Sequence, residues 1–427
     1  MSNLKNVGVK GAQRDRASKT LIWACFLLLL MVHGSKNAYI AEVVALQDVF
    51  AKSKAEISLA MTYYFITYAA TQIALSFLMG KINLKIFMSV TIGCSAILTI
   101  LIAFMPSISG IYVLCSINGV LQAGTYSGGM AVISKYAPPR HFAFANTLMS
   151  SASALYGFIS YGVTALFVGM GRWDLPFIIL GAMLFIAACF FFYAVNKMRA
   201  FPKVELVKEE VAIVNQPYIR LKTKSSKTVF IIVMMLVALM GNFMHYAVMN
   251  WVPDMLHSVF SMPQEYSILI TLLVPLAMFV GSVVIIRICE RFRNLFVIGI
   301  VTLVIMVFFY VLATLFYDVN IVLTLGIMVI TFMVSSAQRL VYGSILSFKM
   351  SSEINVGSYI AATNAAASIA AGVAPTVAGG IIDAGQGTSG YGTLYVFVLL
   401  LCVVMIVFAT LISIYYLNKK RKENVYN

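Results

Sequence analysis

The chain has 427 residues, of which 61% are apolar and 11% are charged, against roughly 45–50% and about a quarter in soluble domains. So few charged side chains cannot cover a water-soluble surface, which excludes a soluble enzyme and a nucleic-acid-binding module. The net charge of +15 therefore needs another explanation than DNA or RNA.

Apolar stretches of about 20 residues, the length that crosses roughly 30 Å of hydrocarbon, follow one another along the whole chain. We identify twelve, at 20–45, 57–80, 86–105, 109–134, 142–168, 173–196, 228–252, 264–288, 295–316, 319–346, 355–381 and 391–417. The first run lacks a small-residue cleavage site, so we interpret it as a membrane helix and not as a removable signal peptide. The pattern predicts an all-α polytopic membrane protein with twelve transmembrane helices in two six-helix halves.

One long polar stretch, 197–227, separates the first six spans from the last six and is typical of a solvated cytoplasmic linker. The predicted organisation is an N-terminal tail at 1–19, a first half at 20–196, this linker, a second half at 228–418 and a C-terminal tail at 419–427. Six spans followed by six suit a duplicated transporter whose site lies between two parallel repeats.

The placement of positive charge predicts the orientation. With twelve spans both termini lie on one side, and 25 of the 30 lysines and arginines fall in the tails and connections of that side. Only Lys52, Lys54 and Arg172 fall on the other. By the positive-inside rule both termini are cytoplasmic in a multi-pass protein of the cytoplasmic (inner) membrane. The basic excess then reflects topology and contact with anionic lipid, and no nucleic-acid partner is expected.

Ionisable side chains within the spans are the most informative residues, because a charge at mid-bilayer costs about 2.5–3.5 kcal/mol on insertion scales and needs a partner, water or a function. The spans contain His33, Lys36, Glu42, His245 and Arg339. No phosphate-binding loop, catalytic triad or metal-ligand spacing is present, and the six cysteines lie singly. We therefore expect neither an enzyme nor an ATP-driven pump, and no metal or cofactor.

In the first span, Lys36 lies 17 residues after Lys19, about 25 Å along a helix. It can extend its ammonium group to the outer surface or, with His33, Asn37 and Tyr39 nearby, face a water-filled cavity. Glu42 points away from Lys36 on a straight helix, so it either faces another helix or titrates in a proton-coupling step.

Arg339 lies ten residues before Lys349, about 15 Å from the cytoplasmic edge, and its neighbours in the sequence are unusually polar. A guanidinium group binds carboxylate or phosphate with two hydrogen bonds, which favours a substrate role. The alternative is a structural ion pair, with Glu42 as a possible partner. His245 in the seventh span is either a neutral hydrogen-bonding residue or a titrating one and is, with Glu42, a coupling candidate.

Two further patterns allow both a structural and a functional interpretation. The tyrosines of the second span, including Tyr64, are typical of packing or of the membrane interface, but they would also suit a cavity wall opposite Lys36. Small residues are concentrated at 119–129, 150–154 and 361–380. They allow close helix packing, which can be static or can permit a rocking contact.

On these residues the chain resembles the major facilitator superfamily and, more narrowly, its organophosphate:phosphate antiporter family of glycerol-3-phosphate and hexose-phosphate transporters. The resemblance covers nearly all of 20–420. The motifs that carry it are 35–37, 119–124, 171–173, 245–253 and Gly281 with Glu290 and Arg291.

The chain departs from that family at the positions that bind phosphate. The resemblance implies one arginine in the first span and one in the seventh, but these positions hold Ser35 or Lys36 and His245. The superfamily's Asp-Arg signature is missing from the connection at 80–85. Arg339 is the cation that could compensate.

Together these observations predict a secondary transporter that moves a small organic anion, with a phosphate ester as one candidate, by alternating access. We expect Lys36, Tyr39, Tyr64, His245 and Arg339 to bind the substrate, and antiport or a proton gradient to drive a monomer in the lipid bilayer. The alternatives are a non-transporting receptor for a sugar phosphate and a drug or metabolite exporter. The sequence leaves the substrate, the coupling ion and the direction of transport open.

Overall fold

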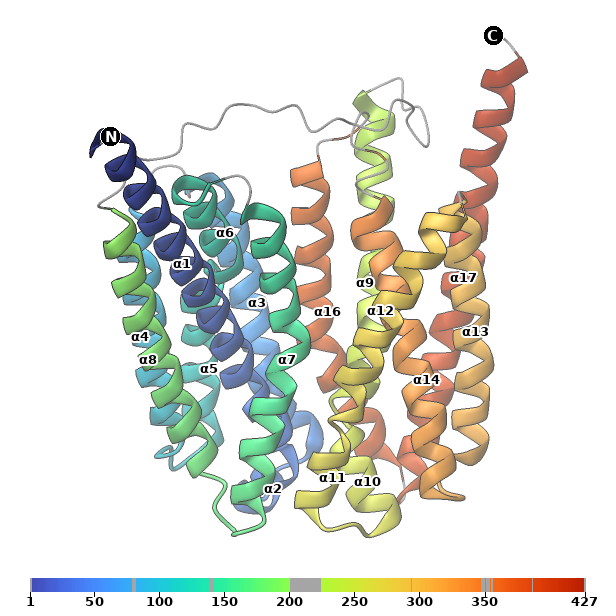
Figure 1. Cartoon of the computed structure of the whole chain (residues 1–427). Helices are drawn as coiled ribbons and strands as arrows, with labels where there is room; N and C mark the ends of the chain where they lie inside the picture. Colours follow the sequence, from blue (N-terminus) through green and yellow to red (C-terminus); the bar gives the residue numbers. More distant parts are fainter. Residues whose placement is uncertain are drawn as a thin grey trace. The chain divides into compact units, whose positions relative to one another are not determined.

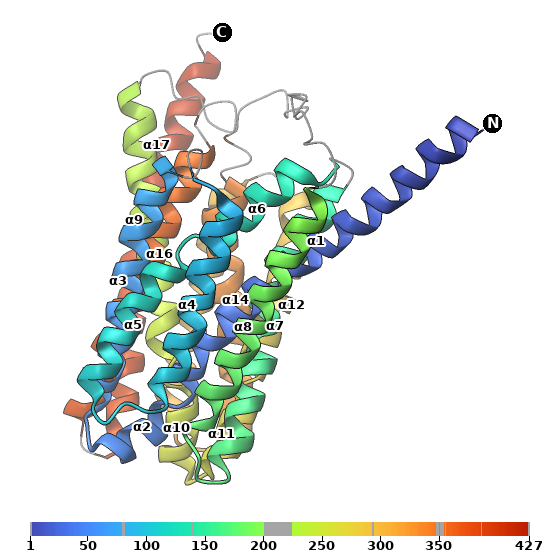
Figure 2. The same cartoon turned by 90° about the vertical axis from the view of Figure 1, so that its left-hand side faces the viewer.

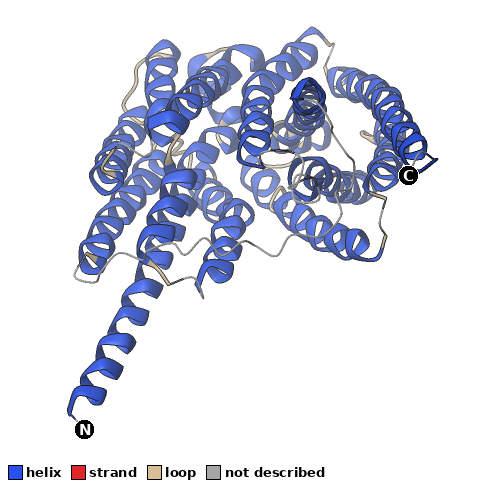
Figure 3. Cartoon of the chain, turned by 90° about the horizontal axis from the view of Figure 1, so that it is seen from above, coloured by secondary structure: helices blue, strands red, loops and turns tan. Residues whose placement is uncertain are grey.

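The computed structural model describes residues 2–78, 82–138, 141–199, 224–292, 294–346, 350, 354, 356–385 and 387–425. Within these ranges the chain is helical and contains no β-strand (Figure 3). The helices are α1 (Ser2–Ala41), α2 (Val43–Phe50), α3 (Lys54–Leu78), α4 (Leu84–Ile102), α5 (Ile108–Gln122), α6 (Thr125–Tyr136), α7 (Phe142–Val168), α8 (Leu175–Met198), α9 (Lys224–Met249), α10 (Val252–Phe260), α11 (Gln264–Ile270), α12 (Leu273–Arg291), α13 (Leu295–Phe316), α14 (Ile321–Leu340), the π-helix η2 (Val341–Ile345), α16 (Val356–Ala384) and α17 (Ser389–Val425).

The predicted fold class is confirmed, because ten of these helical segments are long and apolar enough to cross a membrane. They match ten of the twelve predicted spans. The remaining two spans, 57–80 and 142–168, coincide with α3 and α7, which are helices of 25 and 27 residues. The structure is thus consistent with twelve transmembrane helices.

The chain forms two compact units that differ from a simple division at the linker. Unit 1 comprises Met1–Leu46 and Ile66–Glu209, and unit 2 comprises Gln47–Phe65 and Glu210–Asn427. The first twelve residues of α3 therefore belong to unit 2 and the rest of α3 to unit 1. Most of the predicted linker, 200–223, lies outside the described residues, so the predicted domain boundaries remain a prediction.

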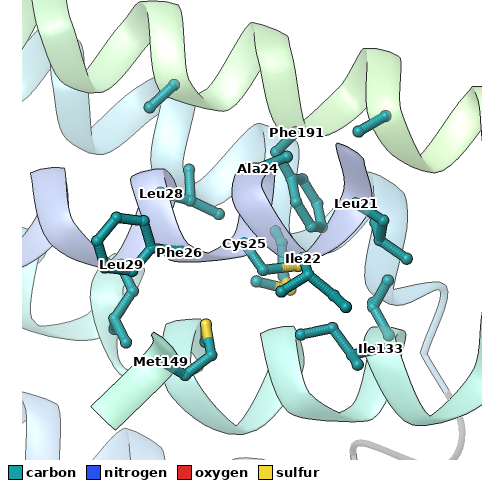
Figure 4. Close-up of a cluster of buried hydrophobic side chains, with 14 of the residues drawn as sticks. Leu21, Ile22, Ala24, Cys25, Phe26, Leu28, Leu29, Ile133, Met149 and Phe191 are labelled. Carbon is teal, nitrogen blue, oxygen red and sulfur yellow. The ribbon is translucent and has the colours of Figure 1, made fainter. Parts of the chain in front are cut away.

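In unit 1, α1 is the central helix and packs along α7 and α8, while α4 packs against α8. Apolar side chains of α1 interlock there with Ile133, Met149 and Phe191 (Figure 4). The N-terminal turns of α1 extend beyond its neighbours (Figure 2). An apolar face that packs on three helices explains why this span is the most buried of the candidate membrane spans.

Unit 2 is built on the pairs α9 with α16, α12 with α14, and α13 with α17 (Figure 1).

Local sequence determines where several helices of both units begin. The side chains of Ser107, Asn294 and Asn320 accept backbone hydrogen bonds at the first turns of α5, α13 and α14, which satisfies N–H groups that have no partner within the helix.

Four predicted spans are interrupted in the structure: the first and the seventh, and also 109–134, between α5 and α6, and 264–288, between α11 and α12. The first breaks at Glu42, between α1 and α2, although the backbone N–H of Glu42 still donates to Ala38 at 3.0 Å. The seventh does not end at residue 252, because α9 is followed after Trp251 by α10, which extends it to Phe260. A proline in the first turn of α10 suits this second start.

The close approach of α12 and α14 at Gly281 leads to a testable prediction. A Cβ atom on Gly281 would overlap the backbone carbonyl of Met333, which cannot move without displacing α14. We expect Gly281→Ala to lower the free energy of unfolding by about 1–3 kcal/mol, as overpacking of a filled interior does. Thermal unfolding of the detergent-solubilised protein would measure this.

Gly326→Ala on α14 is the matched control, because nothing lies within 4 Å of its added methyl group. Its Tm should stay unchanged or rise slightly, since alanine favours helix more than glycine does. Equal melting temperatures for the two variants would contradict close packing at Gly281.

Candidate functional site

A buried polar cluster of unit 2 lies where α9 meets α14. Asn242 and His245 are three residues apart on α9, and Ser335 and Arg339 are four apart on α14, so each pair shares a helix face. The guanidinium Nη1 of Arg339 donates to Oδ1 of Asn242 at 3.3 Å, and Nδ1 of His245 lies 3.2 Å from Oγ of Ser335. Two polar contacts thus join α9 to α14 within their membrane-spanning parts.

This cluster is largely buried, but some of its polar atoms have no hydrogen-bond partner among the described residues. His245 is fully buried, and its Nε2 has no hydrogen-bond partner among the described residues. The same holds for Oε1 of the buried Gln338, next to Arg339. Gly241 leaves room for this amide, because a Cβ there would lie 2.8 Å from Oε1 of Gln338. Buried polar atoms without a partner are costly, so the cluster has unused capacity to bind a polar ligand.

A π-helical turn, Val341–Ile345, begins two residues after Arg339. Such turns are rare and are frequent at functional sites. Here the turn places the buried Tyr342 over Gly299 of α13, where a Cβ would overlap the tyrosine hydroxyl. The hydroxyl of Tyr359 on α16 donates to the carbonyl oxygen of Tyr342. The irregular turn is therefore supported from two neighbouring helices.

In unit 1 the polar face of α1 contains the other predicted cation. Lys36 and His33 are half-buried, and the ring of His33 stacks on Tyr156 with centroids 5.6 Å apart. The amide of Asn37 donates to the carbonyl of His33 at 2.7 Å. Lys36 thus lies on a polar face of α1 on which His33 contacts α7.

Two predicted binding tyrosines are packed among other aromatic rings. Tyr39 in unit 1 is 1% exposed, with its ring centroid 6.5 Å from that of Phe177. Tyr64 in unit 2 is 2% exposed and lies edge-on to Phe65. The structure brings His245 and Arg339 together within unit 2, since the two are close enough to interact electrostatically. The assignment of these residues, with Lys36, Tyr39 and Tyr64, to substrate binding remains a prediction.

The coupling candidate Glu42 is fully buried at the break between α1 and α2. Among the described residues, no side chain or backbone group donates a hydrogen bond to either of its carboxyl oxygens. The acid of the Arg172–Asp174 ion pair is near enough to interact with it electrostatically. A buried carboxyl group without donors is unusual, and this isolation is compatible with proton binding.

A third polar network, which the sequence did not predict, joins α3 to α10 within unit 2. The ammonium of Lys54 lies 2.8 and 2.6 Å from the two carboxyl oxygens of Asp254. The hydroxyl of Tyr391 donates to the same carboxylate at 2.6 Å. The side chains of Lys54 and Asp254 are only 17% and 3% exposed, so the ion pair is mostly removed from water.

Further contacts hold the start of α3 to α16. The carboxylate of Asp383 accepts the backbone N–H groups of Lys54 and Ala55 at 3.2 and 3.0 Å. The hydroxyl of Thr62 donates to the carbonyl of Gly372 at 2.6 Å. A single sequence signal pointed to this network: Lys54 is one of only three cations on the side opposite the termini.

Known proteins share sequence with much of this chain. Residues 24–375 match the family model described as Major Facilitator Superfamily. The "Uncharacterized transporter BU588" of Buchnera aphidicola is 26% identical over 194 residues, 45% of this chain and 46% of that protein. The "MFS-type transporter cnsO" of Penicillium expansum is 28% identical over 177 residues, 39% of this chain and 34% of that protein. The matches span less than half the length of either relative.

Solved structures share the fold at low identity. A bacterial homologue of the human lysosomal transporter Spinster, in an inward-facing and unoccupied conformation, has a TM-score of 0.72 and 15% identity over 94% of this chain and 98% of that one. A point mutant of the nucleoside transporter NupG has a TM-score of 0.68 and 13% identity over 92% of this chain and 99% of that one. At such identities the likeness shows the fold alone.

The support of the π-turn can be tested by removing one hydroxyl group. Tyr359→Phe deletes the donor to the carbonyl of Tyr342, so we expect the free energy of unfolding to fall by about 1–3 kcal/mol. Thermal unfolding of the purified protein would measure the loss.

Tyr310→Phe provides the matched control for this variant. Tyr310 is also buried, but its hydroxyl has no hydrogen-bond partner among the described residues. Its removal should leave Tm unchanged or raise it. A larger loss of stability in this control than in Tyr359→Phe would contradict the assignment.

Proposed function

Because the chain belongs to the Major Facilitator Superfamily, a family of membrane transporters, we propose that it moves a small organic anion across the cytoplasmic membrane by alternating access. The observation that carries this proposal is the pair of polar contacts between α9 and α14, Arg339 with Asn242 and His245 with Ser335. They place a permanent positive charge and several neutral hydrogen-bonding groups inside a span.

The sign of the substrate follows from the charges within the predicted spans. Apart from the two residues at each end, the predicted spans contain two cations, Lys36 and Arg339, and one acid, Glu42, and a charge within the hydrocarbon requires compensation. A bound anion supplies it. Arg339 is suited to a carboxylate or phosphate because its planar guanidinium presents two parallel N–H groups. Lys36 contributes a second positive charge.

Neutral groups around Arg339 would orient the substrate. The contact to Asn242 fixes one edge of the guanidinium group. Nε2 of His245 and Oε1 of Gln338 lack partners among the described residues, so both are available to hydroxyl or amide groups of a ligand. A ligand with an anionic end and several hydroxyl groups matches this set, and a phosphate ester is the narrower candidate.

The phosphate ester rests on the resemblance to the organophosphate:phosphate antiporters, and the chain departs from them where they hold arginines. A carboxylate such as a hexuronate fits the same groups. If the chain is instead a receptor that binds a sugar phosphate without moving it, ligand binding would occur without flux. An exporter of apolar compounds would not require Arg339.

We propose Glu42 or His245 as the residue that couples transport to a proton gradient, with antiport as the alternative energy source. Glu42 is the stronger candidate, because its buried carboxyl group lacks hydrogen-bond donors among the described residues. Gaining and losing a proton would let it avoid a permanently uncompensated buried charge.

Arg339→Ala tests the anion site. A thermal-shift screen of sugar phosphates, hexuronates, dicarboxylates, amines and nucleosides would first identify a ligand. Its uptake into proteoliposomes should then fall by at least ~30-fold in Arg339→Ala, since losing a desolvated charge contact costs about 2–5 kcal/mol. Arg287→Ala, which removes an exposed cation of α12, is the matched control and should transport normally.

Undiminished uptake by Arg339→Ala, at equal amounts of protein in the membrane, would rule out the anion site. Binding of the ligand without any flux in the unmodified protein would favour the receptor.

Glu42→Gln tests coupling. If Glu42 carries the proton, this variant should still exchange labelled for unlabelled substrate but should no longer accumulate it in response to a pH gradient. Exchange and accumulation that fall in parallel would contradict a coupling role.

Asp174→Asn is the matched control for Glu42. The hydrogen bonds from Arg172 hold the pKa of Asp174 below its usual value, so this acid stays ionised at neutral pH and cannot carry the proton. Its replacement should keep accumulation in response to a pH gradient, with only the midpoint of the pH dependence shifted, because Asp174 interacts electrostatically with Glu42.

A further inference from the structure

The carboxylate of Asp254 accepts an unusually complete set of hydrogen bonds. Lys54 contacts both oxygens, Tyr391 donates at 2.6 Å, and the hydroxyl of Ser258 lies at 3.4 Å. Lys54 also lies 5.7 Å from the ring centroid of Trp251. Among the described residues, the ion-pair partner of Asp254 is Lys54.

We propose that Asp254 is a cation-exchange site: it releases Lys54 when the first turns of α3 separate from unit 2, and it then binds a small cation, a proton or a sodium ion, from the outer compartment. The proposal goes beyond the anion site and concerns different residues. Only the role of this exchange in transport rests on the proposed function, because the exchange itself can be measured without any substrate.

The contact between α3 and α16 is made through small residues of α16 and a few polar contacts, Thr62 with Gly372 and Asp383 with the backbone of Lys54 and Ala55. Large apolar side chains of α3, among them Ile57 and Tyr64, are buried as well. A Cβ on Gly372 would lie 2.9 Å from Cβ of Phe65, and one on Gly379 would lie 3.0 Å from the backbone nitrogen of Ala55. Small residues of this kind on α16 let α3 leave its surface without displacing large side chains of α16.

The position of α3 gives this separation a role. Its first twelve residues belong to unit 2, whereas Ile66 and the residues after it belong to unit 1. Alternating access requires the two halves of such a transporter to change their arrangement. Either α3 must bend between Phe65 and Ile66 or its first turns must leave α16, and the second route breaks the pair of Lys54 and Asp254.

Charge balance explains why a cation must replace Lys54. Asp254 is 2% exposed and would keep only the neutral donors Tyr391 and Ser258. Removing one partner of a buried ion pair is strongly unfavourable because the remaining charge is uncompensated. A proton bound to one oxygen, or a sodium ion between the two, removes that cost. The ammonium group of Lys54 leaves as a cation and becomes hydrated while the small cation takes its place, so the charge at Asp254 stays balanced.

Other titratable groups near Asp254 do not take over this role. On α10, Nδ1 of His257 is 2.6 Å from the carbonyl of Met262. On α16, Asp383 is an acid and holds the start of α3. On α17, Tyr391 donates to Asp254 and the hydroxyl of Tyr395 contacts Met255. Gln47 of α2, which Lys54 also contacts, is neutral.

The test is labelling of an introduced cysteine on the docked face of α3 in intact cells. Ser58 is 3% exposed and lies four residues before Thr62, which contacts α16. Ser58→Cys, in a background without the exposed Cys94 and Cys189, would report separation through reaction with a membrane-impermeant maleimide. Val49→Cys on α2, where Val49 is 47% exposed, corrects for the intrinsic effect of pH on the thiol.

In the parent background the labelling of Ser58→Cys relative to Val49→Cys should rise at least about threefold when the external pH falls from about 7.5 to about 5.5, if the cation is a proton. If the cation is sodium, the rise should follow added sodium at constant pH. Asp254→Asn should give high labelling that neither pH nor sodium changes, and Lys54→Gln should give high labelling that does not rise at low pH or with added sodium. Glu56→Gln on α3 removes an exposed ion pair with Lys52, which lies just before this helix, and should keep the parent response.

A parent ratio that responds to neither pH nor sodium would overturn the proposal, as would a parent-like response that persists in Asp254→Asn or in Lys54→Gln. The two variants remove opposite partners, so a folding defect in one leaves the other as a test. Absence of anion flux with a normal labelling response would contradict the proposed function and leave the exchange site standing.

Discussion

The low dielectric of the hydrocarbon core is the constraint on which this structure depends, because it makes every charge or unpaired polar atom within the spans expensive. The chain responds by keeping charges few and by placing them where neighbouring helices supply partners. Arg339 meets an amide and Lys54 meets a carboxylate. Glu42 is the exception, with neither kind of partner among the described residues. The contacts of Arg339 and Lys54 and the carboxyl group of Glu42 are the places where we expect the protein to bind a ligand or an ion.

The architecture was predictable from the sequence because the length of an apolar run has a direct physical meaning in a bilayer. Runs of about 20 residues correspond to the membrane thickness, and ten of the predicted spans coincide with helices that meet that requirement. The polarity of the segment around Arg339 was also visible in the sequence. That Asn242 and His245 of α9 lie opposite this segment was not, because it depends on the rotation of two helices about their axes, which nearly uniform apolarity leaves undefined.

Other features required coordinates for more specific reasons. The pairing of Lys54 with Asp254 joins residues 200 positions apart, and neither residue has a neighbour in the sequence that suggests the other. The π-turn after Arg339 has no composition of its own and is stabilised by Tyr359 from another helix. The predicted boundary between halves follows the polar linker, whereas packing assigns 47–65 to unit 2, since the first turns of α3 contact residues of the second half such as Asp254 and Gly372.

The membership of α3 in both units has a mechanical consequence. A continuous helix of 25 residues extends about 37 Å at 1.5 Å per residue and resists bending. Force applied at one end is therefore transmitted to the other, as in a lever. A displacement at Lys54, where the helix begins, therefore moves residues several turns away without any rearrangement of the side chains between them. The stiffness of this one backbone segment would then set how closely the chemistry at one end of unit 2 is timed to the movement of unit 1.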